Sequence, residues 1–274
     1  MATQQTKRQG QMSMIVINLP WRHDRLAEFT RKWPVNFMVQ DGITHKMPHT
    51  GCGLSHIAAI RKGLGSTSRN TVLVLEDDCD LDINFDSFCD LLETFESHSN
   101  DFDVIVFDPS HDDSSSKPIE DLCVKRVFNN CVQIEPTTRL IGCHCCLWSR
   151  RALYLLQEYE NALNKYYFLP IDRMIFNNKW SSSDLETWER CIDNMFKSSK
   201  NSNHVVPMPP DLVWTPPTTW VCTDHVVKLR SSFSDHTREI NKMPSVDQLM
   251  LKLRSANDIY TKQLLHQLNI RIQI

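Results

Sequence analysis

Short, continuous runs of apolar residues recur along the chain and alternate with segments whose apolar positions follow a helical period. The apolar runs lie at residues 14–19, 37–39, 72–75, 102–107 and 140–148. A short run rich in β-branched residues and leucine is typical of a strand that is buried on both faces. Strands of this kind alternating with helices predict an α/β fold, in which helices cover a largely buried sheet.

Helices are predicted between these strands. Apolar side chains at positions 26, 29 and 33 keep a helical spacing, and Pro34 ends that helix. A second helix is expected at residues 57–64, with Ser55 as its cap. Further helices are expected near residues 85–95 and 149–156, whereas the proline-rich passage at 205–220 predicts an ordered loop.

The two ends of the chain depart from this pattern. Residues 1–12 are polar and predict a flexible N-terminus, so that one catalytic domain would span residues 13–230. A capping box at 245–248 begins a last amphipathic helix, which predicts a C-terminal helical extension over residues 231–274. We expect its apolar stripe to pack within the chain, with a homodimer contact or attachment to a membrane surface as the alternatives.

The candidate chemistry lies where the run at residues 72–75 ends abruptly in acid. Glu76, Asp77 and Asp78 follow it directly, and Asp80 completes an Asp-x-Asp set. In an open α/β sheet the carboxyl ends of the strands form the edge at which ligands bind. Carboxylate oxygens are the ligands that Mg²⁺ and Mn²⁺ prefer, so the pattern predicts a metal site for a phosphate-bearing substrate. A solvated acidic turn or a helix cap is the alternative.

Composition narrows the classes of function. A formal net charge of −3 and a pI near 6.4 provide no basic field, so we expect no nucleic-acid partner. Among the ten cysteines, no Cys-x-x-Cys pair is matched by a second one, as a usual zinc site would require. No apolar stretch approaches the ~20 residues that span a bilayer. We therefore expect a cytoplasmic protein without a transmembrane segment, whose thiols are mostly buried and not bridged. The Cys-His-Cys-Cys run at 143–146 is too tightly spaced for a usual zinc site and predicts a buried strand.

Several motifs resemble, in their order, those of glycosyltransferase family 25, which includes lipopolysaccharide, lipooligosaccharide and collagen galactosyltransferases. The matching elements are residues 15–19 with Arg22, Asp24 and Arg25, residues 39–42, Gly51-Cys52 with Ser55-His56, and residues 73–78, 102–106, 147–152 and 170–172. The resemblance implies a GT-A fold, a Rossmann-like mixed sheet flanked by helices that uses a divalent cation and a nucleotide-activated sugar, commonly UDP-linked. It also implies inverting transfer, by direct displacement at the anomeric carbon.

The resemblance assigns roles to the polar motifs position by position. Asp78 is the first choice for a metal ligand and Asp80 the second, while Glu76 or Asp77 would contact the ribose or orient the ligands. The remaining residues expected around the base and diphosphate are Asn18, Arg22, Arg25 and His56.

A further carboxylate is expected to activate the acceptor. Asp172 lies in an apolar run and matches the family's acidic position, so we expect it to be the general base that takes the proton of the acceptor hydroxyl. A helix cap or an ion pair with Arg173 is the alternative. Asp224 and His225 are weaker candidates for a loop that closes over the diphosphate or metal.

The sequence thus predicts a metal-dependent, inverting glycosyltransferase that uses Mn²⁺ or Mg²⁺. It would move a hexose such as galactose or glucose from a nucleotide sugar, with UDP favoured, to a hydroxyl of a glycan, lipooligosaccharide or glycoprotein. Two alternatives stay open. One is a catalytically inactive module of the same fold that binds sugar nucleotides or glycans. The other is a metal-dependent phosphohydrolase, because two-metal hydrolases also use aspartates at strand ends.

Overall fold

The structure is a computed structural model that describes residues 13–45, 48–111, 124–128, 131–136, 140–166, 170–176, 215, 217–222 and 226–229. Its main sheet consists, in spatial order, of β2 (Met38–Asp41), β1 (Met14–Asn18), β3 (Thr71–Glu76), β10 (Cys145–Ser149), β5 (Val104–Val106), β11 (Thr219–Cys222), β8 (Cys131–Ile134) and β7 (Val124–Phe128). Two small sheets pair β4 (Cys79–Leu81) with β12 (Val227–Leu229) and β6 (Ser110–His111) with β9 (Leu140–Ile141).

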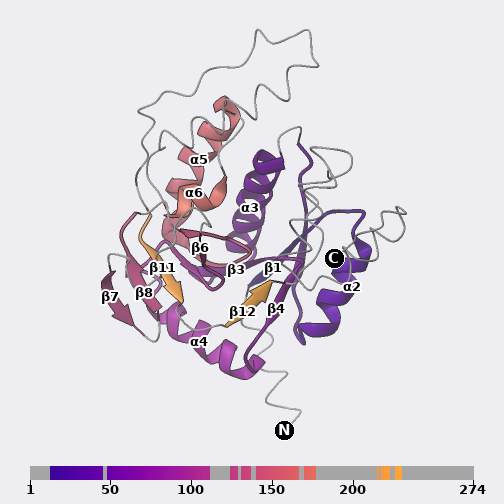
Figure 1. The fold of residues 1–274 in the computed structure, drawn as a ribbon, viewed down its shortest axis with the longest axis horizontal. Helices are drawn as coiled ribbons and strands as arrows, with labels where there is room; N and C mark the ends of the chain where they lie inside the picture. Colours follow the sequence, from indigo (N-terminus) through magenta and orange to yellow (C-terminus); the bar gives the residue numbers. More distant parts are fainter. Residues whose placement is uncertain are drawn as a thin grey trace, which may run out of the picture.

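Helices cover both faces of the main sheet (Figure 1). On one face lie α2 (His23–Lys32) and α4 (Phe85–Ser97); on the other lie α3 (Pro48–Gly65), α5 (Leu153–Tyr166), which follows the short 3₁₀ helix η2 (Arg150–Ala152), and α6 (Ile171–Phe176). The sheet is mixed, since β1 pairs in parallel with β2 and β3, whereas β10 is antiparallel to β3 and β5. The predicted α/β class is therefore confirmed. Within the described residues, no helix is both long and apolar enough to cross a bilayer.

The strand β3 explains why the apolar run at its centre is continuous. Val72 and Val74 pack into the core on the α3 side, and Leu73 and Leu75 pack into the core beneath α2 and α4. Successive side chains of a strand point to opposite faces, so a strand covered on both sides needs apolar residues at every position. Polar residues of this segment can therefore occur only after the buried run, at the carboxyl end of β3.

The first half of the chain forms a topological switch point at that end. In the strand order β2-β1-β3, helix α2 connects β1 to β2, and helix α3 connects β2 to β3 on the other side of β1. The two helices lie on opposite faces of the sheet. Ligands of open α/β sheets bind at such a switch point, outside the carboxyl ends of the strands. The residues that end β1 and β3 here are Asn18 and Glu76.

Three local predictions were wrong. The helix α3 begins at Pro48 rather than after Ser55, because proline suits the first helical turn, and the Ser55 hydroxyl donates to the Gly51 carbonyl within the helix. The run at 140–148 is split into β9 and β10, since Gly142 adopts φ 107°, a left-handed conformation that favours glycine. Residues 219 and 220, predicted as the end of a loop, instead begin β11, which lies between β5 and β8.

The predicted ends of the chain lie outside the described residues. This applies to the flexible N-terminus at 1–12, the helical extension at 231–274 with its dimer contact, and the pair Asp224 and His225. These remain predictions.

We expect the close packing of α3 on β3 to make Gly63→Ala destabilising. A Cβ at this position would collide with Val72 Cγ2 and lie 3.1 Å from Ile15 Cδ1, so we expect a loss of about 1–3 kcal/mol in the free energy of unfolding. Gly65→Ala is the matched control, because its Cβ would meet no atom within 4 Å and alanine favours helices by up to about 1 kcal/mol. Urea denaturation measures both. Equal effects of the two substitutions would contradict this packing.

Candidate functional site

The acidic turn after β3 is held by an arginine from α2. Arg25 Nη1 lies 2.9 Å from Asp77 Oδ1, and its Nη2 lies 3.2 Å from Asp78 Oδ2. The side chains are 12% exposed for Arg25, 6% for Asp77 and 18% for Asp78, so solvent screens these ion pairs only partly. The structure thus brings together three of the predicted site residues at the carboxyl edge of the sheet.

Asp80 forms an ion pair with a different residue of α2 from the one that pairs with Asp77 and Asp78. Its Oδ2 lies 2.5 Å from Nζ of Lys32, in the last turn of α2, and the Trp33 indole next to it donates to the Cys79 carbonyl at 2.9 Å. The two carboxylates of the Asp-x-Asp set therefore meet cations from different turns of α2. Asp78 is the more exposed of the two, at 18% against 10% for Asp80, and is better placed to meet an incoming ion.

Burial changes the acidity of the turn. The pKa of Asp77 rises to about 7, because burial disfavours its charged form and the neighbouring charges of Asp78 and Glu76 add to this, against the opposing effect of Arg25. Asp77 therefore carries less charge at neutral pH than an exposed carboxylate. This favours a role in orienting Asp78 over direct metal ligation.

The end of β1 supplies amide and guanidinium groups to the same edge. Asn18 Nδ2 donates to the Leu19 carbonyl at 2.8 Å, while Asn18 Oδ1 is buried and has no hydrogen-bond partner among the described residues. An unsatisfied buried acceptor is rare and is typical of a position completed by water or ligand. Arg22, whose side chain is 13% exposed, donates two bonds of 3.0 Å to Asp24, which is 55% exposed, so solvent reaches the acidic partner and a ligand could replace it.

A second group of polar side chains lies at the other side of the β3 terminus. Cys52 and His56 are four residues apart and share one face of α3. Their donor atoms meet those of Glu76 and Cys143, and all four atoms lie within 4.8 Å of one another. We call these four residues the Cys-His-Glu cluster. In the described part of the chain it is the only group of three or more such side chains this close together.

The predicted residue His56 belongs to this cluster and not to the acidic turn. Its Nε2 lies 3.2 Å from Glu76 Oε1, and the imidazole is fully buried. Burial lowers the pKa of His56, but the Cys52 thiol and the Glu76 carboxylate raise it by more, to about 9. The sequence predicted His56 and Glu76 at the site but missed Cys52 and Cys143.

His144 and Asp108 were also missed. His144 Nδ1 lies 2.6 Å from Asp108 Oδ2, and its carbonyl accepts the Glu76 backbone N–H at 2.7 Å. Burial lowers the pKa of His144, but the charges of Glu76 and Asp108 outweigh it and raise the pKa well above its usual range. The raised pKa favours the protonated form of His144 beside the end of β3. The only sequence signal was the run at 143–146, which pointed to a strand.

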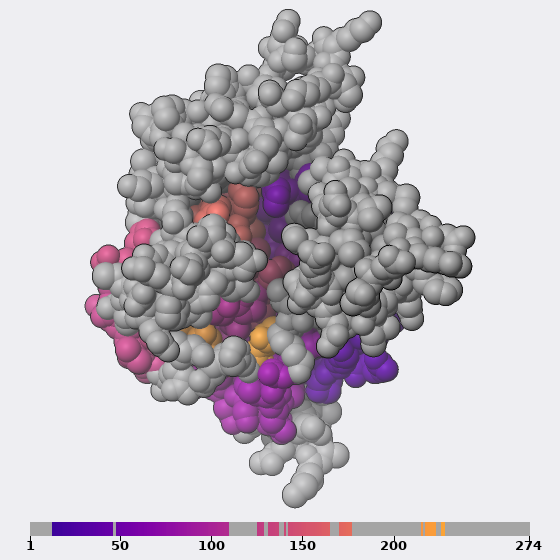
Figure 2. Space-filling model, in the orientation of Figure 1, coloured from indigo at the N-terminus to yellow at the C-terminus, as the bar shows by residue number. Residues whose placement is uncertain are grey.

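Asp172 lies in the first turn of α6. Its Oδ1 accepts the backbone N–H of Arg173 at 2.8 Å, and the N–H of Gly142 donates to the same carboxylate. Asp172 lies inside the helix and is not its N-cap residue, so these bonds do not decide between the base and the cap alternatives. Burial raises the pKa of Asp172, as a general base requires. Figure 2 shows atoms in the colours of α3 and of the α5–α6 region side by side near the middle of one face.

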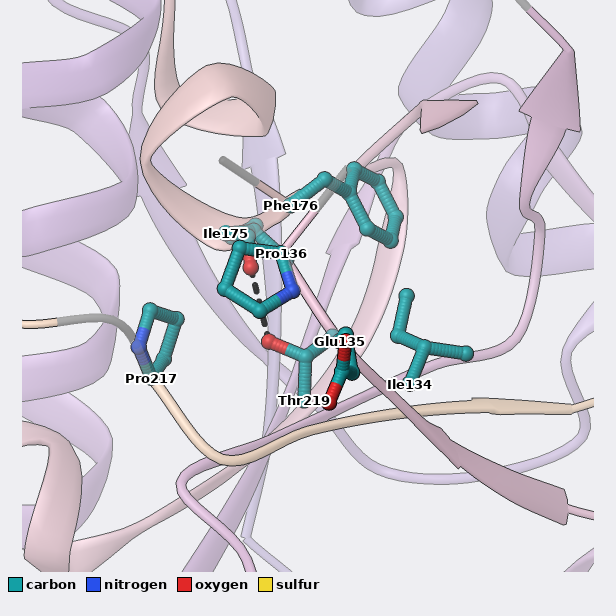
Figure 3. A pocket seen from close by; sticks show the side chains of 7 residues that line it. All are labelled: Ile134, Glu135, Pro136, Ile175, Phe176, Pro217 and Thr219. Carbon is teal, nitrogen blue, oxygen red and sulfur yellow. Dashed lines mark hydrogen bonds between the residues drawn. The ribbon is translucent and has the colours of Figure 1, made fainter. Parts of the chain in front are cut away.

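A separate small hollow lies near the β8 and β11 side of the sheet (Figure 3). It is lined by Ile134, Glu135, Pro136, Ile175, Phe176, Pro217 and Thr219. The Thr219 hydroxyl donates to the Ile175 carbonyl at 2.7 Å, which ties β11 to α6. Its volume of about 180 Å³ includes open solvent, and this is below the ~300 Å³ typical of ligand pockets.

Comparisons with known proteins return weak likenesses. No family model matches the chain, and no curated protein matches it. Among solved structures it is similar to A197 from STIV, with a TM-score of 0.35 and 11% identity over 81% of this chain and 95% of that one. It is also similar to a glycosyltransferase involved in the glycosylation of the major capsid of PBCV-1, with a TM-score of 0.34 and 12% identity over 58% of this chain and 71% of that one.

A third similar structure is an apo UDP-glucose pyrophosphorylase, with a TM-score of 0.34 and 10% identity over 57% of this chain and 66% of that one. Likenesses at this level carry no argument about activity. The functional interpretation rests on the residues of the site.

Replacing Arg25 by Gln should destabilise the fold, because it leaves the buried acidic turn without its cation. We expect a loss of about 2–3 kcal/mol, against at most about 1 kcal/mol for Arg22→Gln, whose partner Asp24 is 55% exposed. Urea denaturation in a chelating buffer gives both values. Equal losses for the two variants would show that Arg25 does not hold the turn.

Proposed function

We propose that the protein is a nucleotide-sugar-dependent glycosyltransferase of the GT-A type. The observation that carries the proposal is the acidic turn, which follows β3 at the switch point of the sheet and faces Arg25. Nucleotide ligands of α/β sheets bind at that edge. The order of the motifs that resemble glycosyltransferase family 25 supports the same assignment.

The donor set of the turn fits a divalent ion of the Mg²⁺ or Mn²⁺ type. Such ions take one or two protein carboxylates and complete their coordination with substrate phosphates and water. Asp78 is the carboxylate we assign to this role, and Asp80 would join it only by leaving Lys32. When bound, the ion would neutralise the negative charge that develops on the diphosphate leaving group.

Cationic and amide groups of the chain would hold the nucleotide. Arg22 can exchange its exposed partner for phosphate oxygens, because guanidinium groups bind phosphate through paired hydrogen bonds. Asn18 Oδ1 is a buried acceptor without a partner among the described residues. It could accept a hydrogen bond from an N–H of the base or a hydroxyl of the ribose. Arg25 would shift from Asp78 toward the diphosphate as the ion arrives.

Asp172 is the group we assign to the acceptor hydroxyl. Its burial within α6 keeps its carboxylate more basic than that of an exposed aspartate. The carboxylate would accept the hydroxyl proton as the acceptor oxygen attacks the anomeric carbon and the bond to the diphosphate breaks. Direct displacement of this kind inverts the anomeric configuration.

The finer assignments are part of the same proposal. We favour a UDP-linked hexose as donor, a glycan, lipooligosaccharide or glycoprotein as acceptor, and a cytoplasmic setting. These follow from the resemblance to glycosyltransferase family 25 and from the composition.

Asp78→Asn should abolish metal-dependent sugar transfer while the fold is kept. The assay incubates the protein with Mn²⁺ and a panel of UDP- and GDP-sugars and follows transfer to an acceptor or slow donor hydrolysis. Glu93→Gln, an exposed substitution on α4, is the matched control and should retain activity. Donor binding without turnover would favour the inactive module, and hydrolysis of phosphate esters alone would favour the phosphohydrolase.

Asp172→Asn should lower turnover by about 10²-fold or more and leave donor affinity unchanged, the effect expected for loss of a general base. In the native protein the base works only when deprotonated. Because burial raises its pKa above 3.8, the acid limb of kcat/KM should lie above that value. The variant should lose this limb. A normal rate or an unchanged pH profile would rule out the assignment.

A further inference from the structure

The four donors of the Cys-His-Glu cluster come from three separate parts of the fold. Cys52 and His56 lie on α3, Glu76 ends β3, and Cys143 precedes β10. These elements meet because β3 pairs with β10 and α3 packs on β3. The left-handed conformation of Gly142 turns the chain just before Cys143. Donors so far apart in the sequence converge only through the tertiary structure.

Three of the six donor–donor distances are close to those of a small tetrahedral coordination shell, and all six lie within 4.8 Å. Cys143 Sγ lies 3.8 Å from His56 Nε2, and Cys52 Sγ lies 3.8 Å from Glu76 Oε1. The His56 Nε2 to Glu76 Oε1 distance is 3.2 Å. With Zn–S near 2.3 Å and Zn–N or Zn–O near 2.0–2.1 Å, neighbouring donors of a tetrahedral zinc site lie about 3.3–3.8 Å apart.

We propose that the Cys-His-Glu cluster is a binding site for a borderline-soft divalent ion, with Zn²⁺ as the best match, distinct from the acidic turn. Thiolate and imidazole ligands select Zn²⁺ over Mg²⁺ or Mn²⁺, which prefer oxygen. Four protein ligands leave no open position, so the ion has a structural role. It ties α3, the end of β3 and the segment before β10 to one another.

Metal binding at this site releases protons from the ligands and changes no oxidation state. Each thiol loses its proton to solvent as its sulfur binds the ion, and a protonated imidazole must likewise release the proton on Nε2 to solvent before that nitrogen binds. No electron transfer is involved. The ion also fixes Glu76, the residue directly before the acidic turn, so it would set the position of Asp77 and Asp78 without touching them.

The test measures metal on the full chain, purified in reductant without a metal-affinity step. We expect about one Zn²⁺ per chain by elemental analysis, and Co²⁺ substitution should give the intense visible bands of a tetrahedral site with thiolate-to-metal charge transfer. Cys52→Ser and Cys143→Ser should each weaken binding by at least about tenfold. Cys89→Ala, at a buried cysteine of α4 on the opposite face of the sheet, is the matched control and should bind normally.

Two further measurements separate this site from the proposed active site. Asp78→Asn should leave the zinc stoichiometry unchanged, and excess Mn²⁺ should not displace Zn²⁺. If a serine variant fails to fold, the unmodified protein still tests the zinc site. A chelator should lower its Tm and make the thiols of Cys52 and Cys143 accessible to labelling. Substoichiometric zinc with no tetrahedral Co²⁺ spectrum, or a disulfide between Cys52 and Cys143 in place of metal uptake, would overturn the proposal.

Discussion

The burial of β3 on both faces is the constraint on which the rest of the structure depends. Because no residue from Val72 to Leu75 can be polar, all chemistry carried by this strand is displaced to its carboxyl end. The helices that bury the strand then also provide the partners of those polar residues. Arg25 reaches the acidic turn from α2, while Cys52 and His56 approach Glu76 from α3.

This arrangement places two chemically different donor sets on either side of one strand terminus. Glu76 faces sulfur and imidazole, whereas Asp77 and Asp78 face a guanidinium group. A hard cation with phosphate ligands suits the second set and a softer one suits the first. The separation follows from geometry, because the chain turns directly after Glu76 and points the next carboxylates toward α2.

The sequence was most informative where local pattern and tertiary burial agree. The run ending in Glu76 predicted both the strand and its acidic end, since continuous burial leaves a visible signature. The Cys-His-Glu cluster left no such signature: Cys143 meets Cys52 only through strand pairing, and the turn at Gly142 was hidden inside an apolar run. The strand β11 was missed for a related reason. Its prolines suggested a loop, although they end just before the residues that enter the sheet.

The insertion of β11 has a consequence for biosynthesis. This strand fills the gap between β5 and β8, both of which precede it by a long stretch of chain. A nascent polypeptide that has emerged only as far as α6 therefore carries two open strand edges, with unpaired backbone amides and carbonyls. Folding must await a late segment, and such non-local closure is slow. During translation, the incomplete sheet is a natural target for chaperones or for aggregation.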